Sequence, residues 1–267
     1  MTNLKVRKPA IQIKAISLRP DWLGGNGFLS QFLNSLSMLF PAGEGFFIHA
    51  VQSALPQVED PELVETVGLF IGQEAVHSRL HLLLNQRLKD CGLFNLVEPL
   101  ARWRIRHSQG LAVTSKLAIT MAYEHFTALF GEMMFGHPEW LENAEQEMSD
   151  LWMWHAAEEM EHRAVAFDVY QAIGGGTVRR LSWFLYVSLV FLTDLFMQQL
   201  LNLIRTGLMW RGGTWAEAFH LLLGRQGVLW RLAPAWFDYL RPGYHPLQRG
   251  CDAEAKAWLQ GKEGLFS

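Results

Sequence analysis

Two segments of the chain, each with a glutamate followed three residues later by a histidine, constrain the fold more than any other feature. In WHAAEEMEHR, the side chains of His155, Glu159 and His162 fall within about 60° of one another on a helix of 3.6 residues per turn. In QEAVHSRLH, Glu74 and His77 repeat the same Glu-x2-His spacing. Each segment therefore predicts a helix that presents metal-binding side chains along one face.

Two further glutamates stand alone in strongly apolar segments with helical character. Glu44 lies in FPAGEGFFIHAV and Glu124 lies in TMAYEHFTALF. A carboxylate that is buried without a partner is strongly unfavourable, so each of these side chains needs a cation. Gly43 and Gly45 leave room beside Glu44 for a ligand or a neighbouring helix.

The segments that carry these residues can meet at one level of an antiparallel bundle. Residues at one level lie at equal distances along the chain from the turn that connects their helices. The midpoints of the successive pairs fall at or beside predicted turns. The pairs are Glu44–Glu74, His77–Glu124 and Glu124–Glu159, and the turns are at 56–61, at Pro99 and just after 136–138.

Apolar periodicity and turn residues predict an all-α chain in three parts. Asp60 caps a helix that Pro61 begins, and the glycines at 174–176 end another. We expect an N-terminal arm (1–20), a four-helix bundle (21–176) and a C-terminal helical extension packed on the bundle (177–267). The expected helices cover about 28–55, 61–89, 110–135, 139–172 and 181–204, followed by two or three shorter ones.

The composition narrows the class of protein and its location. Hydrophobic residues make up 50% of the chain and charged residues 18%, which is typical of a protein with a large buried core. A net charge of -3, with no basic stripe, argues against nucleic acid as a partner. Cys91 and Cys251 lie far apart and form neither a disulfide framework nor a zinc motif. The N-terminus has no signal-peptide pattern, so we expect a cytoplasmic protein.

Residues 181–204 contain a single charged side chain, Asp194, and are long enough to cross a bilayer. However, Asp194, Gln198, Gln199 and Asn202 interrupt the apolar run with a helical period. This pattern favours a buried helix, or a helix that contacts the membrane surface, over a membrane span. We therefore expect peripheral membrane contact through 181–204.

The expected donor set matches two divalent cations. Four carboxylates balance two such ions, and imidazole with carboxylate suits iron or manganese. One glutamate from each of two helices, with Glu-x-x-His from each of two others, is the ligand set of ferritin-like di-metal bundles. We therefore expect a ferritin-like up-down four-helix bundle with additional C-terminal helices. The predicted metal ligands are Glu44, Glu74, His77, Glu124, His155, Glu159 and His162.

Across about residues 28–172 the chain resembles ferritin-like di-iron proteins. The order of its motifs is similar to that of the di-iron arylamine N-oxygenases, whose third histidine ligand would here be His155. The whole chain, with GQEAVHSRLH, YEHF and HAAEEMEHR, also resembles the bacterial family described as predicted metal-dependent hydrolases. The resemblance to the di-iron proteins implies two iron ions, or manganese or a mixed Mn/Fe pair, with dioxygen as co-substrate.

Several functions fit these observations. The main expectation is a di-iron oxygenase or oxidase that acts on an apolar or amphipathic small molecule. The alternative is a metal-dependent hydrolase that uses a metal-activated hydroxide. Iron storage and a metal-free scaffold on the membrane surface are two further possibilities. Without metal, the seven side chains would form a salt-bridge network with Arg79, Arg102 and Arg163.

Other side chains are candidates for orienting the ligands. For Glu158, and for its neighbour Glu161, a solvated position is the simpler expectation. His125 and His137 have weaker claims to the site. The four candidates for contact with the metal ligands are His81, Glu158, Tyr123 and Arg163.

We also expect a homodimer.

Overall fold

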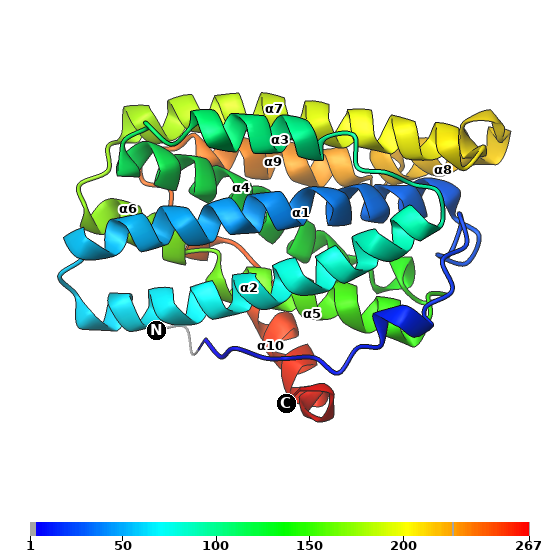
Figure 1. Ribbon diagram of the computed structural model, residues 1–267, viewed down its shortest axis with the longest axis horizontal. Coiled ribbons are helices and arrows are strands. Elements are labelled where there is room, and N and C mark those ends of the chain that lie inside the picture. Colours follow the sequence, from blue (N-terminus) through cyan, green and yellow to red (C-terminus); the bar gives the residue numbers. More distant parts are fainter. Residues whose placement is uncertain (1–3, 226, 267) are drawn as a thin grey trace.

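The computed structural model describes residues 4–225 and 227–266, and it confirms the all-α prediction. Within these residues the only β-type pairing is an isolated bridge between Pro9 and Phe266. The long helices run side by side along the longest axis of the molecule, with α7 at one edge of the view and α10 at the other (Figure 1).

Four rods of helix surround the core. They are α1 (Gly27–Ala54), α2 (Pro61–Asp90), α4 (Val113–Gly136) and the consecutive pair α5 (Gln146–His162) and α6 (Val165–Ala172). The side chain of Asn26 caps α1 by accepting a hydrogen bond from the backbone N–H of Leu29. Asp60 caps α2 in the same way through Glu62, and Pro61 occupies the first helical position, as predicted.

A glycine sets the distance between α4 and α5. A Cβ atom on Gly131 would lie 2.9 Å from the carbonyl oxygen of Ala156, so a larger residue would force the two helices apart. Gly131 lies two helical turns after Glu124 on the same face of α4. The close approach therefore brings Glu124 near the histidine-bearing face of α5.

The structure differs from the expected helices in two places. The helix expected over 139–172 is divided into the 3-10 turn Pro138–Trp140, α5 and α6, with a break at residues 163–164. Arg163 lies at this break, where its buried guanidinium donates to the carbonyl oxygen of Met160. The segment between α2 and α4 was expected to be a connection, but it contains α3 (Glu98–His107), which has no buried residue.

The helix expected over 181–204 is α7 (Thr177–Arg205), which packs on α1 and α4. Its inner face carries polar side chains beside buried apolar ones such as Phe184 and Phe191. Asp194 forms an ion pair with Arg104 of α3, Gln198 accepts from the backbone N–H of Leu96, and Asn202 donates to Ser35. Within the described residues, α7 is the one helix long and apolar enough to cross a membrane. In its most apolar window, 39% of the residues are buried inside the molecule.

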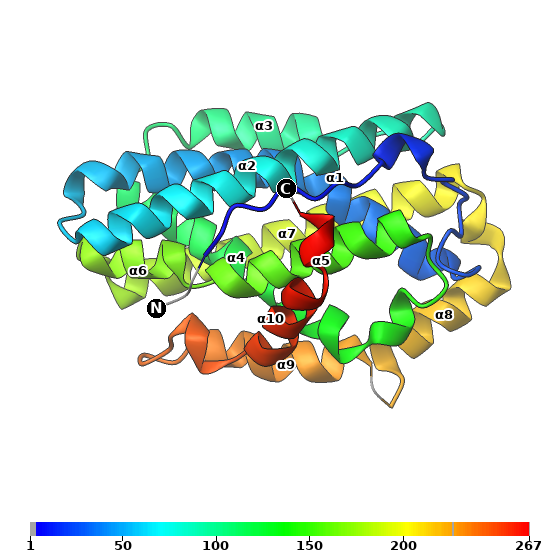
Figure 2. The same cartoon turned by 90° about the horizontal axis from the view of Figure 1, so that it is seen from below.

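Three shorter helices complete the C-terminal part, in agreement with the expected two or three. They are α8 (Gly212–Leu223), α9 (Val228–Tyr239) and α10 (Asp252–Gly261). The described part of the N-terminal arm lies on the body of the molecule, where Leu4, Ile13 and Ile16 are buried. Figure 2 shows this arm running beside α2 and passing close to the C-terminus on its way to α1.

Candidate metal centre

All seven predicted ligands come together in the interior, on four helices. Each of these side chains is at most 2% exposed. The first comes from α1, the next two from α2, the fourth from α4 and the last three from α5: Glu44, Glu74, His77, Glu124, His155, Glu159 and His162.

Glu159 lies at the middle of the cluster. Its Oε1 atom is 3.0 Å from Nε2 of His155 and 3.4 Å from Nδ1 of His77. Its Oε2 atom is 3.4 Å from Nε2 of His162. The two oxygens of one carboxylate thus face histidines on opposite sides of the cluster.

Glu74 has a similar position on the facing helix. Its Oε1 atom lies 3.1 Å from Nε2 of His162 and 3.6 Å from Nδ1 of His77. Glu124 completes one side, with Oε2 at 3.4 Å from Nε2 of His162. The donors fall into two compact groups, within each of which the ligand atoms lie no more than 4.8 Å apart: Glu44, His77 and His155, and Glu74, Glu159 and His162.

The donor atoms that face the centre of the cluster have no hydrogen-bond partner. Both carboxylate oxygens of Glu44, Glu74 and Glu124 are buried and unpaired, although such groups are almost always satisfied in proteins. The same holds for Oε2 of Glu159 and for one nitrogen of each histidine. Donors about 2.1 Å from a shared ion, at right angles, lie about 3 Å apart, which is close to the separations here. The residues therefore fit two divalent cations.

The pKa shifts of the buried glutamates also favour bound cations at this site. Burial, reinforced by Glu74, raises the pKa of Glu44 well above its usual range, and burial with Glu159 does the same for Glu124. For Glu159, burial acts to raise the pKa, but His162, His155 and His77 together hold it well below its usual range. Cations would allow all four carboxylates to ionise.

Each histidine of the cluster has an acceptor for its second ring nitrogen. Nε2 of His77 lies 3.0 Å from a carboxylate oxygen of Glu158, which itself pairs with Arg7 at 3.0 Å. When His77 donates to Glu158, its Nδ1 presents a lone pair to the cluster. A carboxylate in this position orients a metal-bound histidine and increases its basicity.

His162 is held in the same manner. Its Nδ1 atom lies 3.0 Å from Oε1 of Gln73, so the ring can donate to that amide oxygen. The amide nitrogen of Gln73 donates to Glu161, and Arg7 forms an ion pair with Glu161 at 2.7 Å. Arg7 of the N-terminal arm is therefore connected to the surroundings of both His77 and His162.

A third chain of hydrogen bonds supports His155. Its Nδ1 atom lies 2.8 Å from Nε2 of His81, and Nδ1 of His81 lies 2.9 Å from the hydroxyl of Ser37. The Ser37 hydroxyl donates to the side-chain oxygen of Asn85. Burial and the neighbouring His155 hold the pKa of His81 well below its usual range, so its ring is neutral. Neutral His81 can therefore accept from His155, whose Nε2 stays free for a metal.

The structure corrects several expectations about the surrounding residues. Glu158 is fully buried, not solvated, because His77 and Arg7 compensate its charge. Arg163 does not face the cluster, since its guanidinium pairs with Asp252. Tyr123 packs between Phe47 and Phe191.

The alternative salt-bridge network is also wrong. Arg79 is exposed, and Arg102 pairs with Glu98 on the surface of α3. His125 contacts the hydroxyl of Tyr244, and His137 pairs with Glu139, so both point away from the cluster. No guanidinium takes the place of a cation among the seven residues within the described chain.

Arg7 and Gln73 were not predicted as site residues. Gln73 lies one helical turn before His77, so the helical period could have indicated it. Arg7 lies in an extended arm, where no periodicity places its side chain.

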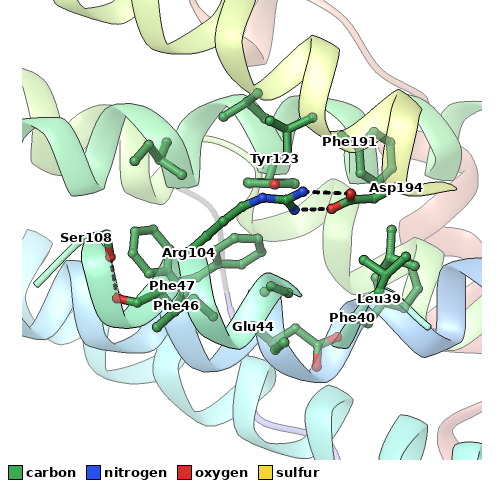
Figure 3. A pocket seen from close by; sticks show the side chains of 18 of the residues that line it. Leu39, Phe40, Glu44, Phe46, Phe47, Arg104, Ser108, Tyr123, Phe191 and Asp194 are labelled. Carbon is green, nitrogen blue, oxygen red and sulfur yellow. Dashed lines mark hydrogen bonds and ion pairs between the residues drawn. The ribbon is translucent and has the colours of Figure 1, made fainter. Parts of the chain in front are cut away.

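An apolar pocket of about 370 Å³ leads from the surface to the cluster and ends at Glu44 and Glu159. It runs between α1, α3, α4 and α7 (Figure 3). Most of its wall is apolar, including Phe40, Phe47 and Phe191, and the ion pair of Arg104 with Asp194 forms its main polar feature. Gly43 also lines the pocket, and a Cβ atom there would contact Phe47.

Comparison with known proteins gives one match. A family model described as predicted metal-dependent hydrolase matches residues 5–250, which is nearly the whole chain. Neither the search of the curated proteins nor that of the solved structures gives a significant match.

Proposed function

Since the chain belongs to the family of predicted metal-dependent hydrolases, we propose that it hydrolyses an apolar or amphipathic small molecule at a buried two-metal centre. The observation that carries this proposal is the apolar pocket that ends at Glu44 and Glu159. A substrate in the pocket would reach the metal ligands without contact with bulk water.

The residues of the cluster would bind the cations, and their neighbours would orient the histidines. Glu44, His77 and His155 would hold one cation, and Glu74, Glu159 and His162 the other, with Glu124 beside His162 as a further donor. Divalent cations in such a site polarise a carbonyl or phosphoryl oxygen and lower the pKa of a bound water. Glu158, Gln73 and His81 would keep the three histidines in the tautomers that metal binding needs.

The pocket would select the substrate by shape and polarity. Its aromatic walls exclude water and favour an apolar chain or ring. The guanidinium of Arg104 is the one cationic group that lines it among the described residues, and Asp194 already neutralises that charge. An anionic headgroup would therefore gain little from this pocket, whereas a neutral ester or amide would fit.

Oxidation is a second candidate reaction, and the donor set favours it. Four carboxylates and three imidazoles, with no cysteine, form the type of set that the ferritin-like di-iron oxygenases use, and the dry pocket would protect a reactive oxidant. Apart from the cations, the pocket offers few groups to stabilise the oxyanion of a hydrolytic transition state, because Asp194 neutralises the charge of Arg104. We propose iron, or manganese, as the metal for this reaction.

Metal analysis followed by two assays separates these reactions. We expect two metal ions per chain after anaerobic loading with iron, manganese or zinc. Hydrolysis of acyl esters of increasing chain length by the manganese or zinc form, without oxygen uptake, supports the hydrolase. Oxygen uptake by the ferrous form with no turnover of any ester supports the oxygenase. A protein that binds no metal contradicts both.

A further inference from the structure

The outer face of α7 is apolar, and its inner face carries both apolar and polar side chains. Leu185, Leu189, Leu192 and Phe196 are 51%, 70%, 53% and 66% exposed. Their spacing of four, three and four residues places them on one stripe of the helix. A surface helix normally has charged and polar side chains on the face that points away from the core. The stripe therefore indicates a surface that becomes covered.

Neighbouring helices extend this surface with aromatic side chains. Trp103 of α3, Trp215 and Phe219 of α8, and Trp230 and Phe237 of α9 are all exposed. Figure 1 shows α3, α8 and α9 on the same side of the molecule as α7, away from α2 and α10. Tryptophan is enriched where proteins meet the interface between water and lipid, because its ring is apolar and its N–H is polar.

The same part of the chain has a strong positive charge. Residues 177–242 contain seven arginines and three acidic residues, a formal charge of +4, whereas the whole chain carries -3 and the remainder therefore -7. None of the three acidic side chains is exposed. Arginines beside an apolar surface match an anionic lipid bilayer. The exposed arginines of this region are Arg179, Arg205, Arg211, Arg225, Arg231 and Arg241.

The mouth of the 370 Å³ pocket lies on this surface. Trp103 and His107 of α3 and Tyr186 of α7 line the pocket and are also exposed. A second apolar cavity, of about 240 Å³, lies along α7 toward α8 and α9, and shares Phe40 and Phe191 with the first. Both cavities include side chains at the apolar surface.

We propose that the surface formed by α3, α7, α8 and α9 docks on an anionic lipid bilayer, and that the pocket receives its substrate directly from the bilayer. In the docked protein α7 lies in the plane of the interface. It does not span the membrane, because Asp194, Gln198 and Asn202 bind its inner face to the bundle. Docking is independent of the reaction at the metals, whereas the substrate route rests on the proposed function.

Vesicle flotation tests the docking. We expect the full chain to float with vesicles of three parts phosphatidylcholine to one part phosphatidylglycerol, more weakly with pure phosphatidylcholine, and less as the salt concentration rises. The double variant Leu185→Glu/Leu189→Glu should bind at least tenfold more weakly, since two leucines lose their place in the apolar interface. The matched control is Leu82→Glu, at a residue 52% exposed on α2, and it should bind like the wild type.

Several outcomes would overturn the proposal. One is no flotation of the wild type with either vesicle, and another is equal flotation of the double variant. If the surface instead binds a second copy of the chain, the wild type is a dimer in solution and the double variant a monomer. Because neither leucine lines the pocket, the double variant should keep its metals and its activity on a water-soluble substrate. Loss of docking with metals retained thus separates this proposal from the proposed function.

A second double variant tests how much the arginines contribute to the binding of anionic vesicles. Arg225→Glu/Arg231→Glu should lose the preference for anionic vesicles by roughly tenfold or more, and keep the weaker binding to phosphatidylcholine. An unchanged preference would contradict the role of the arginines.

Discussion

Nε2 of His77 lies 3.0 Å from a carboxylate oxygen of Glu158, and this contact turns Nδ1 of the same ring toward Glu74 and Glu159. The carboxylate of Glu158 pairs in turn with Arg7, 151 residues earlier in the chain. The N-terminal arm thus helps to fix the orientation of a metal ligand in the centre of the molecule.

Replacement of Arg7 by methionine should weaken metal binding about 10- to 100-fold, the range found when a partner of a metal ligand is lost. The variant leaves Glu158 buried without its cation and Glu161 without its ion pair with Arg7. The hydrogen bonds that orient His77 and His162 should therefore weaken. Competition with a chelator of known affinity measures the effect. Arg19→Met, on the exposed part of the arm, is the control and should bind metal normally. Equal affinity of Arg7→Met and the wild type would show that the arm plays no part in the site.

Glu159→Ala and His77→Ala should each strip metal from the protein and abolish activity while most of the helical circular dichroism remains. Glu159 lies within 3.4 Å of all three histidines, so its loss removes a donor from the centre of the cluster. Metal content by mass spectrometry gives the result. If either variant keeps two metal ions per chain, the assignment of ligands is wrong.

Helical periodicity predicted which side chains lie together in the interior, because side chains three and four residues apart share a face in any α-helix. It therefore indicated which donors of α2 and α5 meet, and the caps at Asp60 and the glycines at 174–176 placed the helix ends. The same principle failed for α3, which has only ten residues and none of them buried. Its position depends on the contact of Arg104 with α7.

The residues that surround the ligands were harder to predict. Glu158 looked solvated because its burial depends on Arg7, and nothing in an extended arm indicates where its side chains lie. The break between α5 and α6 depends on Arg163, whose partners come from residues 246–252 near the C-terminus. Both features are tertiary contacts across long sequence separations, which local patterns do not encode.

Cys251 should react much more slowly with iodoacetamide than Cys91, which is exposed. Burial, with Glu132 and Glu254 nearby, raises the pKa of Cys251 to about 12, so the reactive thiolate is scarce at pH 8. Its rate should rise about tenfold for each pH unit up to pH 10, as the thiolate fraction grows. Mass spectrometry of the alkylated peptides measures both sites. Fast labelling of Cys251 at pH 8 would mean that the segment before α10 does not pack on the body.

The ion pair between Arg104 and Asp194 should stabilise the packing of α7 on α3. Asp194→Leu leaves the guanidinium without a partner in a mostly apolar pocket, and we expect a loss of about 1–2 kcal/mol in the free energy of unfolding, reduced by the partial exposure of Arg104. The double variant Arg104→Met/Asp194→Leu should recover part of this loss, because no charge is left unpaired. Urea unfolding of the wild type, Asp194→Leu, Arg104→Met and the double variant completes the cycle. Strictly additive effects would show that the two side chains do not interact.

Removal of the metals should lower the thermal stability of the whole protein, because the ligands lie on α1, α2, α4 and α5 and the cations join all four. A ligand at 100 times its dissociation constant stabilises the native state by about 2.7 kcal/mol per site. For two sites in a chain of this size, at roughly 2–4 °C per kcal/mol, we expect the midpoint of unfolding to fall by about 10–20 °C after chelation. Scanning calorimetry before and after chelation, and after metal is restored, measures the shift. Glu159→Ala serves as the control, since a protein that binds no metal should unfold at the same temperature with and without the chelator. A wild type whose midpoint does not move would show that the cluster holds no ion that matters to the fold.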